Sequence, residues 1–209
     1  GLDLIGKLFV NPGDRILTES PTYLGALQAW SAYQADYLTV PVDDDGLDVG
    51  RLEAQLRGGP KFLYVLPNFQ NPTGRTMTEA RRAALVAKAA ELGLPLIEDN
   101  PYGDLWFDAP PPPSLASRWP EGVLYLGSFS KVLAPGLRLG YIVAPPALYP
   151  KLLQAKQAAD LHTPGYNQRI VHAVIEHGFL DTHVPTIRAR YAEHRDAMRS
   201  ALERHMPPG

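Results

Sequence analysis

Residues 62–98 read FLYVLPNFQNPTGRTMTEARRAALVAKAAELGLPLIE and carry the clearest signal of the fold class. Its two ends, Phe62–Leu66 and Leu94–Glu98, are short apolar runs of the kind expected for strands covered on both faces. Between them, Thr78–Leu92 is an Ala-rich segment that its first residue can cap and that Gly93 can end. Strand, helix and strand in this order predict parallel strands joined by a helical crossover.

The same alternation extends through much of the chain. Further strands are expected at Arg15–Glu19, Tyr37–Val42, Val123–Gly127 and Gly140–Ala144, and further helices at Leu2–Val10, Tyr23–Ala35, Val49–Leu56 and Ala147–Ala159. From Asn167 to His177 and from Thr182 to His205 the pattern is helical, with no further strand. The sequence therefore predicts an α/β fold with a mainly parallel sheet of six strands and flanking helices.

Composition limits the class of protein. The chain has 209 residues, of which 45% are hydrophobic and 20% charged, as is typical of a folded domain. The formal net charge is -2 and no run of lysine and arginine occurs, so binding to nucleic acid has no electrostatic support. Cysteine is absent and no histidine pair has the spacing of a zinc site, so no metal is expected. No apolar stretch reaches the roughly 18 residues of a membrane span, and we expect a soluble cytoplasmic protein.

Polar residues gather in the loops beside the predicted strands. In open α/β sheets, ligands bind at the carboxyl ends of the strands, so these loops are expected to form one pocket. The loops are Pro67–Gly74, Asp99–Tyr102, Ser128–Lys131 and Pro135–Gly140.

The residue types in this pocket suit pyridoxal phosphate. A desolvated lysine, here Lys131, can attack a carbonyl and form a Schiff base. Asp99, at the end of an apolar strand, would be a buried carboxylate that needs a partner such as a protonated pyridine nitrogen. The hydroxyl and guanidinium groups that suit the phosphate are those of Ser128, Ser130 and Arg138.

The order and spacing of four motifs resemble the signature of the fold type I pyridoxal-phosphate aminotransferases of classes I and II. Residues 21–26 and 160–164 resemble the subgroup of 2-aminoadipate and kynurenine aminotransferases, together with the aminotransferase-like domains of some bacterial regulators. The four motifs are Asn71–Gly74, Asp99 with Tyr102, Ser128–Lys131 and Pro135–Gly140.

The resemblance implies a role for each site residue. Lys131 would carry the Schiff base and move the proton of the substrate Cα, and Asp99 would keep the ring nitrogen protonated. Tyr102, the third catalytic residue, would bind the phenolic oxygen of the ring together with Asn71, while Tyr23 would stack on the ring. The phosphate would be held by Ser128, Ser130 and Arg138. The implied activity transfers an amino group between an amino acid and a 2-oxo acid, 2-oxoglutarate being the expected acceptor, in a homodimer.

The resemblance also implies that parts of the family's fold lie outside this sequence. The family's large domain opens with a strand and a phosphate-binding turn, and its small domain carries an arginine for the substrate carboxylate. Neither is found here. We therefore expect a large, cofactor-binding domain truncated at both ends. Residues 1–178 would form that domain, and residues 179–209 a long helix leading to an absent small domain.

Two other functions fit part of the pattern. Ser128–Lys131 satisfies the Ser-x-x-Lys pattern of penicillin-binding enzymes, but the Ser-Asp-Asn and Lys-Thr-Gly motifs expected with it are absent. The other is a cofactor-binding sensor domain of a transcriptional regulator, which a DNA-binding module elsewhere in the chain would reveal. Single residues also have simpler explanations, since Tyr23 can be a core aromatic residue and Asn71–Gly74 a turn.

Overall fold

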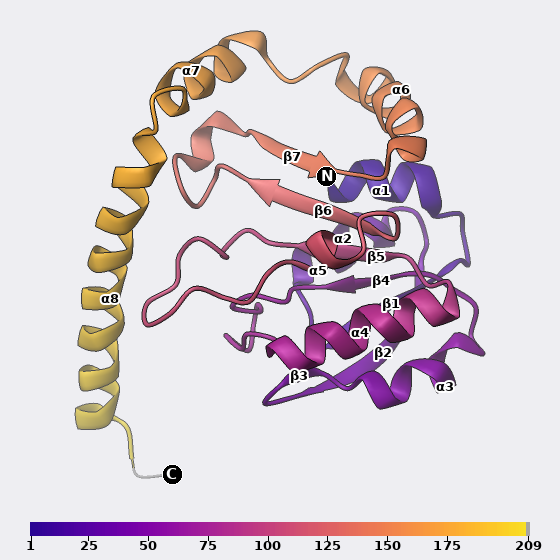
Figure 1. Cartoon of the computed structure of the whole chain (residues 1–209), viewed down its shortest axis with the longest axis horizontal. Helices are drawn as coiled ribbons and strands as arrows, with labels where there is room; N and C mark the ends of the chain where they lie inside the picture. Colours follow the sequence, from indigo (N-terminus) through magenta and orange to yellow (C-terminus); the bar gives the residue numbers. More distant parts are fainter. Residues whose placement is uncertain (208–209) are drawn as a thin grey trace.

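The computed structural model of the chain describes residues 1–207 and contains a seven-stranded sheet (Figure 1). The order across the sheet is β3-β2-β1-β4-β5-β6-β7. Neighbours from β2 to β6 are parallel, whereas β3 and β7 pair antiparallel at the two edges, so the predicted mainly parallel sheet is confirmed. The strands are β1 (Arg15–Ser20), β2 (Asp36–Asp43), β3 (Gly46–Leu47), β4 (Pro60–Val65), β5 (Leu96–Asp99), β6 (Val123–Ser128) and β7 (Gly140–Val143).

Helices cover both faces of the sheet. In β4, Phe62 and Tyr64 contribute to the core under one set of helices, while Leu63 and Val65 contribute to the core under the other, as the alternation of side chains along a strand requires. The first set is α1 (Leu2–Phe9), α2 (Leu24–Ser31) and α6 (Tyr149–Asp160). The second set is α3 (Leu52–Leu56), α4 (Glu79–Leu92) and α5 (Leu115–Arg118).

The strand β7 runs antiparallel to β6 because the connection between them is short. Residues 129–139 contain a 3₁₀ turn, Pro135–Leu137, and no helix that could cross over the sheet. Ser128 consequently pairs with Gly140. The residues just before β7 therefore lie at the same edge of the sheet as those just after β6.

The crossover helix α4 begins and ends at the residues that the sequence predicted. The Thr78 hydroxyl accepts a 3.3 Å hydrogen bond from the backbone N–H of Arg81 and so caps the first turn. Gly93 has a φ of 62°, in the left-handed region that ends helices. Both signals are local, which is why the sequence alone was sufficient to predict them.

Several predicted boundaries are wrong. The helix expected over 23–35 ends at Ser31, because the chain turns at Gln34, which has a φ of 59°. The strand expected over 94–98 begins only at Leu96, since Pro95 has no N–H to donate to a ladder. The prediction also missed β3 and α5, whose two and four residues are too few to produce a periodic signal.

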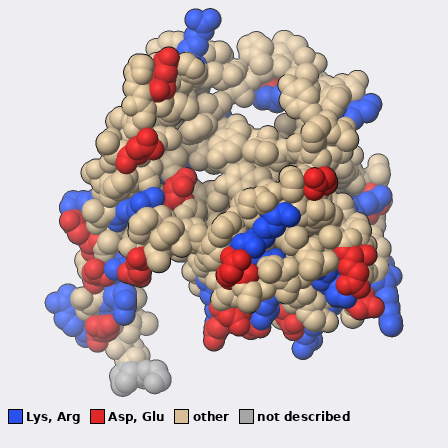
Figure 2. Space-filling view, viewed as in Figure 1, with Lys and Arg blue, Asp and Glu red and all other residues tan. Residues whose placement is uncertain are grey.

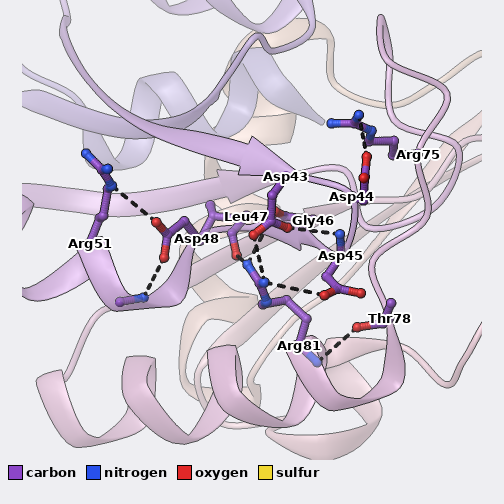
Figure 3. A network of polar contacts seen from close by, with 11 residues as sticks. Asp43, Asp44, Asp45, Gly46, Leu47, Asp48, Arg51, Arg75, Thr78 and Arg81 are labelled. Atoms are coloured by element: carbon purple, nitrogen blue, oxygen red, sulfur yellow. Dashed lines mark hydrogen bonds and ion pairs between the residues drawn. The ribbon is translucent and has the colours of Figure 1, made fainter.

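The missed strand β3 belongs to a hairpin that is fastened to α4 (Figure 3). The guanidinium of Arg81 donates a 2.6 Å hydrogen bond to the Leu47 carbonyl and forms a 2.9 Å ion pair with Asp43. Asp44, next in the hairpin, pairs with Arg75 at 2.6 Å. Arginines from outside the hairpin thus hold its acidic turn against the helix layer.

The last two helices, α7 (Gly165–Ile175) and α8 (Phe179–His205), arch away from the sheet (Figure 1). The helix α8 starts three residues before the predicted Thr182, and Pro208 and Gly209 of the predicted segment 179–209 lie outside the described residues. Acidic and basic side chains are mixed along α8 (Figure 2). Among residues 1–207, no helix is long and apolar enough to cross a membrane.

Candidate active site

The parallel strands bring the predicted site residues together where the strands end, at the carboxyl-terminal edge of the sheet, which differs from the lateral edges formed by β3 and β7. The strands β1, β4, β5 and β6 end at this edge, which faces α8 in Figure 1, and β7 begins there. Tyr23 follows β1, Asn71 follows β4, Asp99 ends β5 and Tyr102 follows it. The β6–β7 segment carries Ser128, Ser130, Lys131 and Arg138. All eight residues therefore lie in loops or strand ends at one edge.

Lys131 and Tyr102 approach each other from neighbouring loops. The Nζ atom of Lys131 lies 5.6 Å from the centroid of the Tyr102 ring, within the range of a cation–π contact. Lys131 is exposed, and within residues 1–207 it forms no ion pair with a carboxylate. Its amine is therefore available to a ligand.

Asp99 is a shielded carboxylate with a hydroxyl partner. Its Oδ2 atom accepts a 2.7 Å hydrogen bond from the hydroxyl of Tyr64, in the neighbouring strand β4. Burial raises the pKa of the Asp99 carboxyl, and the bond from Tyr64 acts in the opposite direction. No lysine, arginine or histidine of the described chain forms an ion pair with Asp99. A cationic group of a ligand would supply the missing partner.

Hydroxyl and guanidinium groups lie along the loop from β6 to β7. The Ser128 hydroxyl accepts a 3.1 Å hydrogen bond from the backbone N–H of Ser130. Arg138 is exposed, has a φ of 51° and donates to the Pro135 carbonyl at 3.3 Å. Within residues 1–207, Arg138 forms no ion pair with a carboxylate, and the two serines of the same loop are half-buried. These groups are donors that suit a phosphate.

Tyr23 occupies the N-terminal end of α2. It is half-buried, and its ring lies against Gly25 so closely that a Cβ atom at Gly25 would be 2.5 Å from the Tyr23 hydroxyl. Glycine is therefore required at residue 25 for this ring position. The stacking role of Tyr23 stays a prediction.

Behind the edge lies a hydrogen-bond chain to which sequence reasoning assigned no role. Asn68 donates to the Asn100 side-chain carbonyl at 2.8 Å, and Asn100 donates to the Tyr125 hydroxyl at 2.7 Å. The fully buried Arg82 of α4 donates to the side-chain carbonyl of Asn68 and to the Pro67 carbonyl. The two asparagines stand three residues before Asn71 and two before Tyr102, and in the sequence they are indistinguishable from turn residues.

A second buried group, Glu19 at the end of β1, supports the same loop. Its Oε2 atom accepts a 3.0 Å hydrogen bond from the backbone N–H of Leu66. Gln70 lies 3.5 Å from the same oxygen and donates to the Pro21 carbonyl at 2.7 Å, which ties the loop after β4 to the loop after β1. Burial raises the pKa of the Glu19 carboxyl to about 8.

These groups define the class of ligand that the edge can bind. Within the described part of the chain, the Lys131 amine and the Asp99 carboxylate have no ion-pair partner. Together with the phosphate-type donors, they fit a group that carries a carbonyl, a basic ring nitrogen and a phosphate. On a mainly parallel α/β sheet, such an edge is typical of an enzyme with an organic cofactor.

The chain belongs to the aminotransferase class I and II family, whose family model matches residues 1–208. It is 46% identical over 215 residues to aromatic-amino-acid aminotransferase 1 of Thermococcus litoralis, an alignment that covers 100% of this chain and 52% of the relative. It is also similar to an uncharacterized HTH-type transcriptional regulator of Bacillus subtilis, at 36% identity over 98% of this chain and 43% of the regulator.

A solved structure gives the same result. The crystal structure of the α-aminoadipate aminotransferase LysN of Thermus thermophilus, complexed with N-(5'-phosphopyridoxyl)-L-leucine, is similar with a TM-score of 0.93 and 44% identity. This similarity covers 99% of the present chain and 54% of that structure. The chain thus spans about half the length of the curated relatives that it matches.

Proposed function

We propose that this protein is a pyridoxal-phosphate-dependent aminotransferase, which transfers an amino group between an amino acid and a 2-oxo acid such as 2-oxoglutarate. The observation that carries the proposal is the meeting, at one sheet edge, of the unpaired Lys131 amine beside Tyr102 and the cation-free carboxylate of Asp99. Family membership and the similarity to named aminotransferases support it.

The residues of the edge fit the cofactor group by group. When bound, pyridoxal phosphate supplies an aldehyde that reacts with amines and a protonated ring that withdraws electrons from the substrate Cα. Asp99 would retain the proton on the ring nitrogen, because a partly buried carboxylate is stabilised by a cationic partner. The phosphate would be held by Ser128, Ser130 and Arg138, which lie in one loop.

Lys131 has two tasks in this proposal. Its Nζ atom would hold the cofactor covalently at the aldehyde carbon, with loss of the aldehyde oxygen as water, and the same amine, when free, would accept the proton of the substrate Cα. The absence of a carboxylate partner among the described residues leaves this amine free to do both. Tyr102 and Asn71 would donate hydrogen bonds to the oxygen substituent of the ring, and Tyr23 would stack on the ring.

We infer a cytoplasmic homodimer that binds neither nucleic acid nor membrane through this segment. We propose that residues 1–178 form the cofactor-binding domain and that residues 179–209 are a separate segment, most of which is the helix α8. The uninterrupted course of α8 from Phe179 to His205 supports this division.

The test is to replace Lys131 in the full-length protein. Lys131→Ala should abolish both the absorbance of the lysine-bound cofactor and the covalent adduct that borohydride reduction produces from it. Mass spectrometry of the reduced parent protein should locate that adduct on the peptide with Lys131. Lys156→Ala is the matched control, because Lys156 lies on α6 and pairs with Asp160. A reducible adduct that survives Lys131→Ala would contradict the proposal.

The relative named as a transcriptional regulator favours a second candidate, a sensor domain that binds the same cofactor. The full-length protein distinguishes the two. Sustained transamination of amino acids with 2-oxoglutarate supports the enzyme, whereas cofactor binding without turnover, together with binding to DNA, supports the sensor.

A further inference from the structure

We propose that Tyr64 is a positioning residue for Asp99, and that its hydroxyl orients the carboxylate toward the nitrogen of the cofactor ring and so strengthens cofactor binding. The inference rests on the proposed function. It assigns a role to a residue that lies inside an apolar strand and that no motif singles out.

The register of the sheet creates the contact. Tyr64 of β4 pairs with Ile97 of β5, so Asp99, two residues further along β5, is its diagonal neighbour on the same face of the sheet. The hydroxyl of a tyrosine is long enough to span this diagonal, and it reaches Asp99 Oδ2 at 2.7 Å. The donor to Asp99, the last residue of β5, is thus a side chain of the neighbouring strand β4 and not of a loop.

The tyrosine ring is held in place. Tyr64 is fully buried, and the ring of Trp30 meets it edge-on, with centroids 5.1 Å apart and planes at 86°. Trp30 is itself fully buried and donates a 2.9 Å hydrogen bond from its indole nitrogen to the Leu2 carbonyl of α1. A donor fixed by two helices can hold a carboxylate in one orientation at no further entropic cost on ligand binding.

The charges and burial around Tyr64 also favour its hydroxyl as the donor and Asp99 as the acceptor. Burial raises the pKa of the Tyr64 phenol, and the charges of Asp99 and Glu19 raise it further, so the hydroxyl stays protonated and donates. The hydrogen bond from the Tyr64 hydroxyl of β4 favours the charged form of Asp99. Within residues 1–207, Tyr64 is the side chain that donates a hydrogen bond to Asp99.

The experiment compares two ligands in the full-length, cofactor-free protein. One is pyridoxal phosphate, and the other is its 1-deaza analogue, in which carbon replaces the ring nitrogen. Tyr64→Phe should weaken binding of pyridoxal phosphate roughly tenfold while leaving the affinity for the analogue unchanged, because only the first ligand uses Asp99. Tyr33→Phe is the matched control, since Tyr33 donates to Asp3 at 2.6 Å at the opposite end of α2 from Tyr23.

Each outcome decides the inference. Equal losses for both ligands would show a merely structural role, and no loss for either would show no role; both results overturn it. Should Tyr64→Phe fail to fold, the single variant Asp99→Asn is compared with the double variant Asp99→Asn/Tyr64→Phe in their affinity for pyridoxal phosphate. In the double variant, loss of the Tyr64 hydroxyl leaves no carboxylate without its hydrogen-bond donor. Different affinities of these two variants for pyridoxal phosphate would overturn the inference. A parent protein that binds neither ligand would instead overturn the proposed function.

Discussion

Glu98 and Asp99 are consecutive residues of β5 whose carboxylates have partners on opposite faces of the sheet. Glu98 Oε2 accepts a 2.9 Å hydrogen bond from the backbone N–H of Ala116 in α5, whereas Asp99 Oδ2 accepts from Tyr64 on the face that α1 and α2 cover. Alternation along a strand thus separates one carboxylate that stabilises the fold from one at the proposed site.

Substitution of Asp99 should therefore lower turnover, whereas substitution of Glu98 should lower stability. In the full-length protein, Asp99→Asn should lower kcat by a factor of about 100 or more with little change in thermal stability, because the carboxylate would keep the ring nitrogen protonated and the protonated ring would accept electrons from the substrate Cα. Glu98→Ala should cost about 2 kcal/mol of unfolding free energy, since it leaves the start of α5 without its acceptor. Turnover and urea unfolding measure the two effects. An Asp99→Asn variant with near-normal single-turnover rates would contradict the proposed role.

Arg82 of α4 is expected to stabilise the fold by holding the loop that follows β4. Its guanidinium donates to the carbonyls of Met77, Pro67 and Pro113 and to Asn68, all from a fully buried position. Arg82→Met should lower the unfolding free energy by about 3 kcal/mol, because several acceptors lose their donor at once.

The adjacent Arg81 provides the comparison for this experiment. It forms its ion pair with Asp43 at a partly exposed position, so Arg81→Met should cost about 1 kcal/mol. Denaturant titration of both variants tests the difference. Equal losses would mean that the buried chain from Arg82 to Asn68 adds nothing.

Stability should depend on pH through Glu19. Burial raises the pKa of this carboxyl from 4.5 to about 8, so the folded state keeps a proton that the unfolded state releases over this range. The contribution of Glu19 to stability is therefore fully present below about pH 4.5 and is lost as the pH rises through 8. Glu19→Gln, which cannot ionise, should gain on the parent by up to about 1.4 kcal/mol per pH unit in this window. Unfolding curves of both proteins at pH 5 and pH 8 would refute this if they shifted in parallel.

Gly103 leaves the space that the Asn100 side chain occupies in the loop with Tyr102. A Cβ atom at this residue would lie 2.5 Å from the side-chain oxygen of Asn100, the amide that bridges Asn68 and Tyr125. Gly103→Ala should displace that amide and weaken cofactor binding roughly tenfold, as expected for the loss of one buried hydrogen bond.

A control for this glycine is available at the start of α7. Gly165 has open space around its Cα, so Gly165→Ala should leave cofactor affinity unchanged. Equilibrium titration of the two full-length variants with pyridoxal phosphate makes the comparison. Equal affinities would show that the Asn100 bridge is not needed to hold the site.

Some features of the protein followed from the sequence because their causes are local. The Thr78 cap and the Gly93 terminus of α4 involve residues within a few positions of one another, and apolar runs mark the main strands. Placing Asp99 and Lys131 at one edge also needed only the order of elements, since parallel strands present their carboxyl ends together.

Other features were decided only by the tertiary structure, because they depend on which strands are neighbours and in what register. The contact of Tyr64 with Asp99 spans 35 positions and exists because β4 pairs with β5 in one register; a slip of one residue would turn Tyr64 to the opposite face. The chain from Arg82 through Asn68 to Asn100 likewise joins a helix to two loops. Hydrophobic pattern and turn chemistry specify elements, but side-chain hydrogen bonds between elements form only once packing has placed their donors and acceptors within reach.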